Sequence, residues 1–335
     1  MIRIFISILF VFILLDCYSQ TSGNEKSDES VIELLEMEND LLVFSINSDS
    51  LTNIYNSWKT QYDKNCQFDS TFSINKLTKY IFTELNIQFD NNSILFSDII
   101  KYRRGNCVTI SLLYLLLANE DYDTMCTVNA PSHHFIRAYD NLRLNYVNIE
   151  PTKNGESYSD EYIIGHKGIP VETITQGVYM NEGNYAYLVN SYKQNIASIL
   201  SIQGKLDEAI ALFNMVIEYD SISPEAYNNR GDCYYAKKEL ELALSDYKEA
   251  IKLNPYFHRF YFSLANTYSN LGMDRNAIVN YDLAIKYYDG YSEYFLNRGI
   301  AYANCNDLYN ACKDLSKSSD MNNEKAKKYL LSVCK

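Results

Sequence analysis

Three residues in the first half of the chain, Cys107, His133 and Glu150, are of the types that make a thiol catalytic site. Cys107 directly follows the segment 103–106 and opens an apolar segment of helical period, 108–118. A thiol at the start of a helix lies near unpaired backbone N–H groups and the positive end of the helix dipole, which lower its pKa towards a reactive thiolate. The same N–H groups could hold the oxyanion of a tetrahedral intermediate, so this position predicts a nucleophile.

The histidine lies in a segment with the composition of a strand, 130–139. Side chains alternate between the two faces of a strand, so His133 shares a face with Phe135 and Arg137, and His134 points to the other face. Because the two adjacent histidines point in opposite directions, a metal ion shared between them is not expected.

A second predicted strand, 144–149, returns from a hairpin at Asp140-Asn141 and ends in Glu150, which shares a face with Asn148. The hairpin can bring Glu150 to His133, while the helix presents Cys107 from the side. The sequence therefore predicts that thiol, imidazole and carboxylate meet in one cleft.

This order of residues, Gly-Asn-Cys at 105–107, His-x-Phe at 133–135 and a carboxylate before Pro-Thr at 150–152, resembles the transglutaminase-like superfamily of papain-like thiol enzymes. The resemblance covers roughly residues 95–160 and the helices before them. It implies that Cys107 is the nucleophile, His133 the general base and acid, and Glu150 the residue that orients the histidine. It also implies attack on a carboxamide, a thioester, and release to an amine or water, with no cofactor.

The chain departs from the family at two positions and is ambiguous at a third. Glu150 stands where the family usually has Asp, and Phe135 where it usually has Trp. His134 beside His133 leaves two candidate bases; we favour His133, because Phe135 then falls in the family's phase. Asn106, Arg104 and Arg137 are expected to be structural or to line the cleft. Relatives with this fold also serve as binding modules only, so the alternative is a non-catalytic protein-binding scaffold.

The second half of the chain repeats with a period of 34 residues. Small residues recur in two series, and bulky residues recur near each: Ala197, Gly231, Ala265 and Gly299; Ala209, Ala243, Ala277 and Ala311; Leu200, Tyr234, Tyr268 and Tyr302; Phe213, Tyr247, Tyr281 and Leu315. A small residue lets two helices approach, and a large one fills the adjacent gap. The pattern resembles the tetratricopeptide repeat, with four units from 190 to 323 and a capping helix after them.

Such arrays bind protein or peptide partners along the concave face of their first helices. By the family's pattern, that groove would carry Gln194, Asn228, Asp232, Tyr235, Phe262, Asn266 and Ile300. For Tyr235 and Phe262 the alternative is packing between helices.

Composition agrees with two ordinary domains. The chain has 335 residues, of which 47% are hydrophobic and 21% charged, with a net charge of −12. No basic patch offsets this charge, so nucleic acid is not an expected partner. We predict an α+β fold: a transglutaminase-like helix-plus-antiparallel-sheet domain over 20–189, with a loop-rich end after 153, then an all-α tetratricopeptide solenoid over 190–335.

The first residues have the pattern of an export signal. Arg3 precedes an apolar run, Ile4 to Leu15, and small residues follow, which predicts a signal peptide over 1–19. The run is shorter than the roughly 20 residues that span a bilayer, so no membrane span is expected. A lipid anchor at Cys17 is the alternative to cleavage after Ser19. We expect an exported protein: periplasmic, in the cell envelope, or secreted. Export permits disulfides, and two pairs are candidates: Cys66 with Cys126, and Cys312 with Cys334.

Overall fold

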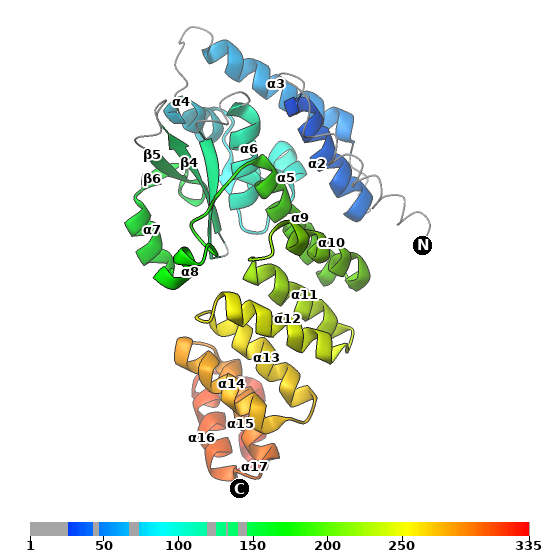
Figure 1. The fold of residues 1–335 in the computed structure, drawn as a ribbon, viewed down its shortest axis with the longest axis vertical. Helices are drawn as coiled ribbons and strands as arrows, with labels where there is room; N and C mark the ends of the chain where they lie inside the picture. The colour runs from blue at the N-terminus through cyan, green and yellow to red at the C-terminus, as the bar shows by residue number, and fades with distance from the viewer. Residues whose placement is uncertain are drawn as a thin grey trace. The chain divides into compact units, whose positions relative to one another are not determined.

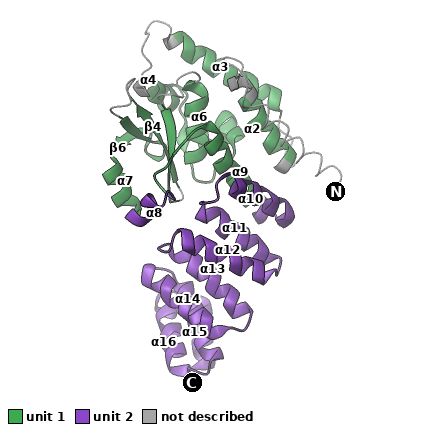
Figure 2. Ribbon diagram, in the orientation of Figure 1, with its two compact units in different colours: residues 1–169, 179–199 green, residues 170–178, 200–335 purple. Residues whose placement is uncertain are grey.

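The computed structural model describes most of the chain: residues 26–42, 47–66, 74–118, 125–131, 133–139 and 146–334. The predicted signal peptide, Cys17 and the predicted turn at Asp140-Asn141 lie outside these residues. The chain divides into two compact units (Figure 2): Met1–Ile169 with Tyr179–Ile199, and Pro170–Val178 with Leu200–Lys335.

The first unit is built around one fully buried helix, α6 (Cys107–Ala118). Every side chain of α6 from Val108 to Ala118 is buried, as expected for a helix that is apolar on all sides. It packs against strand β4 on one side and helix α2 on another (Figure 1). The other helices before the sheet are α2 (Lys26–Leu42), α3 (Ser48–Cys66), α4 (Ile74–Lys79) with the π-helical turn η1 (Tyr80–Glu84), and α5 (Phe96–Tyr102).

An antiparallel sheet with the strand order β6-β5-β4-β3-β7 covers α6. Its strands are β3 (Met125–Ala130), β4 (His133–Tyr139), β5 (Tyr146–Glu150), β6 (Glu156–Tyr158) and β7 (Glu182–Gly183). A separate parallel pair joins β1 (Gln88–Phe89) to β2 (Arg104–Gly105) directly before α6. The predicted α+β helix-plus-antiparallel-sheet architecture is confirmed.

The segment 153–189 is more regular than its glycine content suggested. After the 3-10 turn η3 (Pro151–Lys153) come β6, α7 (Asp160–Lys167), α8 (Val171–Thr175), β7 and the start of α9 (Tyr185–Ile202). Local capping explains α7: the Ser159 side chain accepts a hydrogen bond from the Tyr162 amide, and Gly168 ends the helix with φ +62°.

The first helix of the predicted array, α9, belongs in part to the first unit. The Tyr192 hydroxyl on α9 donates to the buried carboxylate of Glu38 on α2 and accepts from the Phe96 amide at 2.8 Å. Glu38 also accepts from the Ser97 amide, at 3.1 Å. These buried hydrogen bonds join α9 to α2 and α5, so the first unit extends along α9 to Ile199 and not only to the predicted boundary at residue 189.

The second unit is the repeat array. Its helices are α10 (Leu206–Tyr219), α11 (Pro224–Ala236), α12 (Leu240–Leu253), α13 (His258–Asn270), α14 (Asp274–Tyr287), α15 (Ser292–Asn304), α16 (Leu308–Asp320) and α17 (Glu324–Val333). The alanines of the small-residue series that lie on these helices are fully buried. A Cβ on Gly231 would lie 2.8 Å from the ring of Tyr247, which is why this position has no side chain. The predicted tetratricopeptide solenoid is confirmed.

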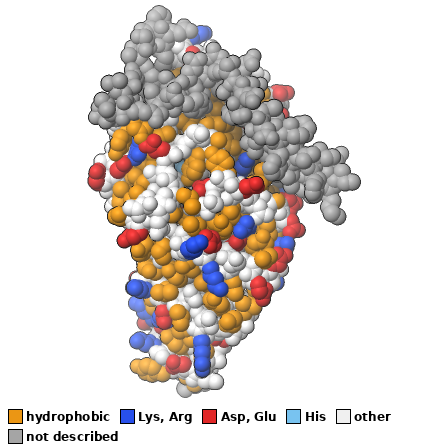
Figure 3. All heavy atoms as spheres, in the orientation of Figure 1, with side chains coloured by type: hydrophobic (Ala, Val, Ile, Leu, Met, Phe, Trp, Pro, Cys, Tyr) orange, Lys and Arg blue, Asp and Glu red, His pale blue; other side chains and the backbone are white. Residues whose placement is uncertain are grey.

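Electrostatic links and a disulfide strengthen the array. Arg230 binds both carboxylate oxygens of Asp246, and Arg298 binds both of Asp314, 68 residues further along. Basic and acidic side chains are interspersed with hydrophobic ones on the face of this unit in Figure 3. The predicted pair Cys312–Cys334 forms a disulfide. The side chain of Cys66 lies outside those described, so the other pair stays a prediction. Among the described residues, no helix has the length and hydrophobicity needed to cross a membrane.

Candidate active site

Cys107 is the first residue of α6, and a reciprocal cap shapes the chain just before it. The Asn106 side-chain oxygen accepts from the Thr109 amide at 3.0 Å, while the Thr109 hydroxyl accepts from the Asn106 amide at 2.9 Å. This arrangement has the logic of a capping box and defines where the helix begins. Gly105 cannot be larger, because a Cβ there would lie 2.6 Å from Ile99 on α5 and 2.7 Å from Thr109.

The loop before the thiol is held from both sides. The Gln88 amide donates to the Arg103 carbonyl at 2.8 Å, and the Asn106 amide donates to the Ser93 carbonyl at 3.0 Å. The Arg103 guanidinium lies 4.0 Å from the centre of the Trp58 ring, a cation–π contact. Trp58, the chain's only tryptophan, thus supports this loop from α3, a role that the sequence analysis missed. Arg104 is exposed and lies 4.0 Å from Asp90.

His133 and Glu150 meet as predicted. The His133 Nε2 atom lies 2.7 Å from Glu150 Oε2, and both side chains are buried. The second oxygen, Glu150 Oε1, accepts from the Thr152 amide at 3.0 Å and from its hydroxyl at 2.8 Å. Both carboxylate oxygens are therefore occupied, and the longer Glu side chain reaches the imidazole. Thr152 was part of the quoted motif, but its part in orienting the carboxylate was not foreseen.

The Cys107 side chain is the second group that acts on the imidazole of His133. Since Nε2 is taken by Glu150, Nδ1 is the ring nitrogen that remains for the sulfur. Burial lowers the pKa of His133, but the hydrogen bonds to Cys107 and Glu150 and the charges of both raise it to about 9. Burial opposes ionisation of Glu150 as well, yet the contacts with His133 and Thr152 bring its pKa below the usual value. The charged forms of both partners are thus favoured.

His134 lies on the opposite face of β4, where its ring is 6.1 Å from that of Tyr187. Burial, with the charge of His133 added, lowers the pKa of His134 to about 3. Its Nδ1 atom has no hydrogen-bond partner among the described residues. A neutral ring on the far face cannot serve the thiol, so the geometry selects His133 of the two candidates.

Arg137, four residues after His133 on the same face of β4, makes a buried polar cluster of its own. It donates to Asn148 on β5 at 2.9 Å, to Glu182 on β7 at 3.0 Å and to Asp160 on α7 at 2.5 Å. These contacts link β4 to two other strands of the sheet and to α7, so Arg137 is a structural residue.

The predicted groove residues divide into polar and apolar members. Asp232 accepts from the Tyr247 hydroxyl at 2.7 Å, and Asn266 accepts from the Tyr281 hydroxyl at 2.7 Å, the same contact one repeat later. The remaining groove residues are half-buried. Asn228 donates to Asp232, and Tyr235 accepts from Asn270. The Phe262 ring lies 4.5 Å from the Tyr294 ring, Ile300 packs on the core of the last repeat, and Gln194 lies on α9 in the first unit. Phe262 and Ile300 thus pack among helices.

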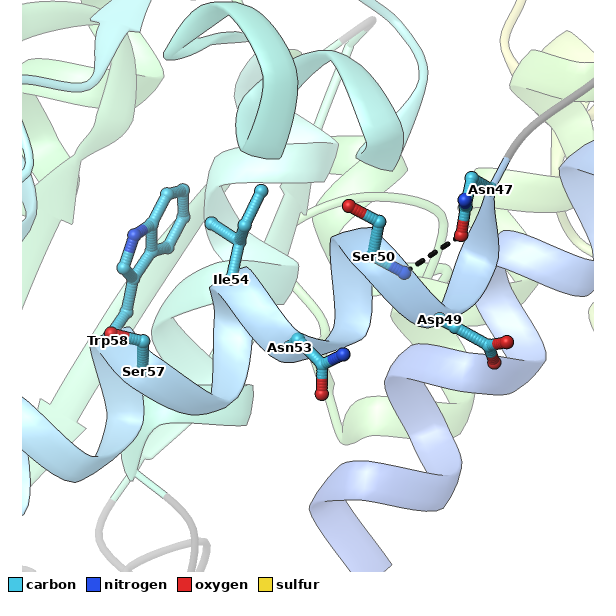
Figure 4. Close-up of a pocket in the computed structure, with 7 residues that line it drawn as sticks. All are labelled: Asn47, Asp49, Ser50, Asn53, Ile54, Ser57 and Trp58. Atoms are coloured by element: carbon cyan, nitrogen blue, oxygen red, sulfur yellow. Dashed lines mark hydrogen bonds between the residues drawn. The ribbon is translucent and has the colours of Figure 1, made fainter.

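An open hollow of 590 Å³ lies along α3 (Figure 4), lined by Asn47, Asp49, Ser50, Asn53, Ile54, Ser57 and Trp58. The Ser50 amide donates to the Asn47 side chain at its rim, at 2.9 Å. None of the predicted catalytic residues lines it. Among the described residues, no group of three or more His, Cys, Asp or Glu side chains is placed to hold a metal ion.

Comparison with known proteins identifies both parts of the chain. Residues 48–164 match the transglutaminase-like superfamily, and tetratricopeptide repeat families match residues 197–237, 224–257 and 258–290. The heat shock protein STI1 of Saccharomyces cerevisiae is 30% identical over 115 residues, which cover 34% of this chain and 17% of STI1. The chloroplastic tetratricopeptide repeat protein PYG7 of Arabidopsis thaliana is 42% identical over 53 residues, 16% of this chain and 18% of PYG7. The chain thus spans less than a fifth of the length of these curated relatives.

Among solved structures, a crystal structure of MamA covers 41% of this chain and 81% of its own chain, with 24% identity and a TM-score of 0.39.

Proposed function

We propose that this chain, in which a transglutaminase-like domain is followed by tetratricopeptide repeats, is a thiol enzyme for acyl transfer or hydrolysis at amide bonds. One observation carries the proposal: a buried imidazole, His133, lies 2.7 Å from the carboxylate of Glu150, and the Cys107 side chain is close enough to raise the pKa of that imidazole. A thiol, a base and a group that orients the base, in contact in this order, are the parts that thiol acyl transfer needs.

The electrostatics support a protonated His133 beside the Cys107 side chain. With a pKa of about 9, His133 carries its proton at neutral pH, and Glu150 stabilises that charge at 2.7 Å. The thiolate is the nucleophilic form of a cysteine, and a charged imidazole is the partner that thiol enzymes place beside it.

The chemistry then follows in two steps. The Cys107 thiolate attacks the carbonyl carbon of the amide, a C–S bond forms, and the carbonyl electron pair moves to oxygen. His133 gives its proton to the departing nitrogen as the C–N bond breaks, which leaves a thioester and a neutral imidazole. Water or an amine next attacks the thioester carbon, His133 takes its proton, and cleavage of the C–S bond restores the thiolate.

Labelling with iodoacetamide at pH 7 tests this proposal, with the extent at Cys107 followed by mass spectrometry of its peptide. We expect His133→Ala to label at least about tenfold more slowly than the wild type, because an ordinary cysteine with a pKa near 8.5 is only a few per cent thiolate at this pH. The matched control is His166→Ala, since His166 is exposed on α7. Equal and slow labelling of Cys107 in all three proteins would leave the chain a protein-binding scaffold.

We also propose that the repeat array recruits protein or peptide partners through the groove that carries Asp232 and Asn266. The match to tetratricopeptide families supports a protein-interaction array. A bound peptide would exchange hydrogen bonds with these polar side chains. Crosslinking of the full chain in its native cells should place partner crosslinks on α11 and α13, and crosslinks confined to other helices would contradict the groove.

Export is the third part of the proposal, and it rests on the first twenty residues. Mass spectrometry of the purified protein decides between its two forms. Cleavage after Ser19 gives a chain that begins at Gln20, whereas lipidation gives an acylated Cys17 at the N-terminus. An intact N-terminus would contradict both.

A further inference from the structure

The start of α5 is held by side chains from two other helices. Its own N-cap residue, Leu95, has no side chain that can accept a hydrogen bond. Instead, the Ser97 amide donates to Glu38 Oε1 on α2, at 3.1 Å. The Phe96 amide donates to the Tyr192 hydroxyl on α9, at 2.8 Å, and this hydroxyl donates in turn to Glu38 Oε1. Glu38 and Tyr192 thus form the cap that α5 itself does not supply.

The Glu38 carboxyl is an unfavourable group to place at this point of the core. Neither its side chain nor that of Tyr192 has any exposed surface. Burial raises the pKa of Glu38, and its second oxygen, Oε2, has no hydrogen-bond partner among the described residues. A well-packed apolar side chain in such a place is often no less stable, so packing alone does not explain the carboxyl. Its hydrogen bonds to α5 and α9 indicate a different role.

The helix that this pair caps leads directly to the loop before the thiol. After α5, Arg103 adopts the left-handed conformation, with φ +57°, and its amide donates to the Ile99 carbonyl at 3.0 Å. The buried Ile99 side chain lies so close to Gly105 that a Cβ there would be 2.6 Å from it. Because the interior is close-packed, a shift of α5 would displace Gly105, which lies two residues before Cys107.

We propose that Glu38 and Tyr192 are positioning residues for Cys107: they fix the start of α5, and α5 fixes the loop that presents the thiol to His133. This inference rests on the proposed function, because it concerns the meeting of the thiol with its base. Tyr192 lies on α9, and the residues of that helix from 197 onwards match a tetratricopeptide repeat family. The helix that opens the repeat array is therefore also part of the support of the thiol site.

Tyr192→Phe tests this inference in the full chain, because it removes the hydroxyl and keeps the ring that fills the buried site. Iodoacetamide should label Cys107 at pH 7 roughly fivefold more slowly than in the wild type, the factor that corresponds to one typical hydrogen bond. The matched control is Tyr185→Phe, since the Tyr185 hydroxyl on α9 also donates to α2, at the Ser30 carbonyl. Ser30 lies eight residues, about 12 Å, from Glu38 along α2, so this variant should label like the wild type.

A double-mutant cycle with His133→Ala separates positioning from general loosening of the fold. If Tyr192 acts through the meeting of thiol and imidazole, its hydroxyl matters only where the imidazole is present. The double variant should then label at the rate of His133→Ala. A hydroxyl with a merely structural role would change the rate by the same factor in both backgrounds.

Two substitutions of Glu38 separate its acceptor oxygen from its charge. Glu38→Gln keeps an oxygen that can accept from the Ser97 amide and the Tyr192 hydroxyl, so it should label close to the wild-type rate. Glu38→Leu has a similar size and no acceptor, so it should label at least as slowly as Tyr192→Phe. Rescue by glutamine would show that the hydrogen bonds, and not the filled volume, position the thiol.

A Tyr192→Phe protein that labels like the wild type would overturn the inference, and so would an equal fall in Tyr185→Phe or a further fall in the double variant. Equal rates in Glu38→Gln and Glu38→Leu would overturn the role of Glu38. Failure of the proposed function is distinguishable. If Cys107 labels as fast in His133→Ala as in the wild type, the thiol has no partner base, and both proposals fall. If labelling depends on His133 but not on Tyr192, only this inference falls.

Discussion

Replacing Glu150 by Gln removes the negative charge beside His133 and keeps nearly the same side-chain shape. In the wild type, Glu150 Oε2 lies 2.7 Å from His133 Nε2, and both side chains are less than one-tenth exposed. A hydrogen bond to a charged group is worth about 1.5–3 kcal/mol, and solvent screens this buried pair little. The substitution therefore makes the imidazolium less stable by about this amount, which lowers the pKa of His133 by about one to two pH units.

The rate of Cys107 alkylation reports this change, because the thiolate depends on the imidazolium. A loss of about 1.5–3 kcal/mol corresponds to a rate at neutral pH that is roughly 10- to 100-fold lower, since 1.4 kcal/mol is a factor of ten. Iodoacetamide labelling between pH 5 and pH 10 gives both the rate and the midpoint of the upper pH limb. In Glu150→Gln we expect a lower plateau and a limb displaced to lower pH.

Glu156→Gln is the matched control, because Glu156 pairs with Glu150 across β5 and β6 but is exposed and does not contact His133. It should label like the wild type over the whole pH range. A Glu150→Gln protein with the rate and pH profile of the wild type would refute the account, because the carboxylate would then do nothing for the imidazole.

Three further predictions concern stability. The pKa of His133 is raised from 6.5 to about 9 on folding. Its contribution to the free energy of unfolding is therefore complete below pH 6.5 and is lost as the pH rises through 9. The lowered pKa of Glu150 has the opposite effect: its contribution to the free energy of unfolding is present above pH 4.5 and is lost at lower pH. The difference in unfolding free energy between wild type and His133→Gln should therefore narrow from pH 6 to pH 10, and a constant difference in urea unfolding would contradict it. Gly231→Ala should cost about 1–3 kcal/mol, because its Cβ would lie 2.8 Å from the Tyr247 ring; Gly165→Ala, with no atom within 4 Å, should be neutral or stabilising, and equal midpoints in urea would contradict the contrast. Cys312→Ser should lower the unfolding free energy by about 3 kcal/mol, because the disulfide to Cys334 closes a loop between residues that are 22 apart in the sequence. An unchanged midpoint of urea unfolding would show that this disulfide does not stabilise the array.

The parts of the site that the sequence predicted depend on short-range periodicity. Alternation along β4 placed His133 and His134 on opposite faces, and the antiparallel pairing of β4 with β5 then brought Glu150 to within 2.7 Å of His133. In the array, the 34-residue spacing placed Ala243 and Ala277 in contacts that the structure repeats from unit to unit. Such patterns are readable because each residue's surroundings follow from its immediate neighbours in the chain.

The parts that the sequence analysis missed depend on contacts between distant segments. Trp58 meets Arg103 only because α3 packs against α5, and no periodicity relates the two residues. Likewise, β7 pairs with β3 across more than fifty residues, and Tyr192 on α9 reaches Glu38 on α2. The boundary predicted between residues 189 and 190 from the repeat pattern therefore assigned Tyr192 to the array, although its buried hydroxyl joins α9 to the first unit.

The polar cluster around Arg137 explains why Glu150 is available to His133. Both cations lie on the same face of β4, and an unpaired guanidinium four residues away would compete for the nearest carboxylate, since it binds carboxylates in two-pronged geometry. Arg137 is instead satisfied by Asp160 and Glu182, which α7 and β7 bring to it. Each buried cation thus has its own anion, and the charge of Glu150 acts on the imidazole alone.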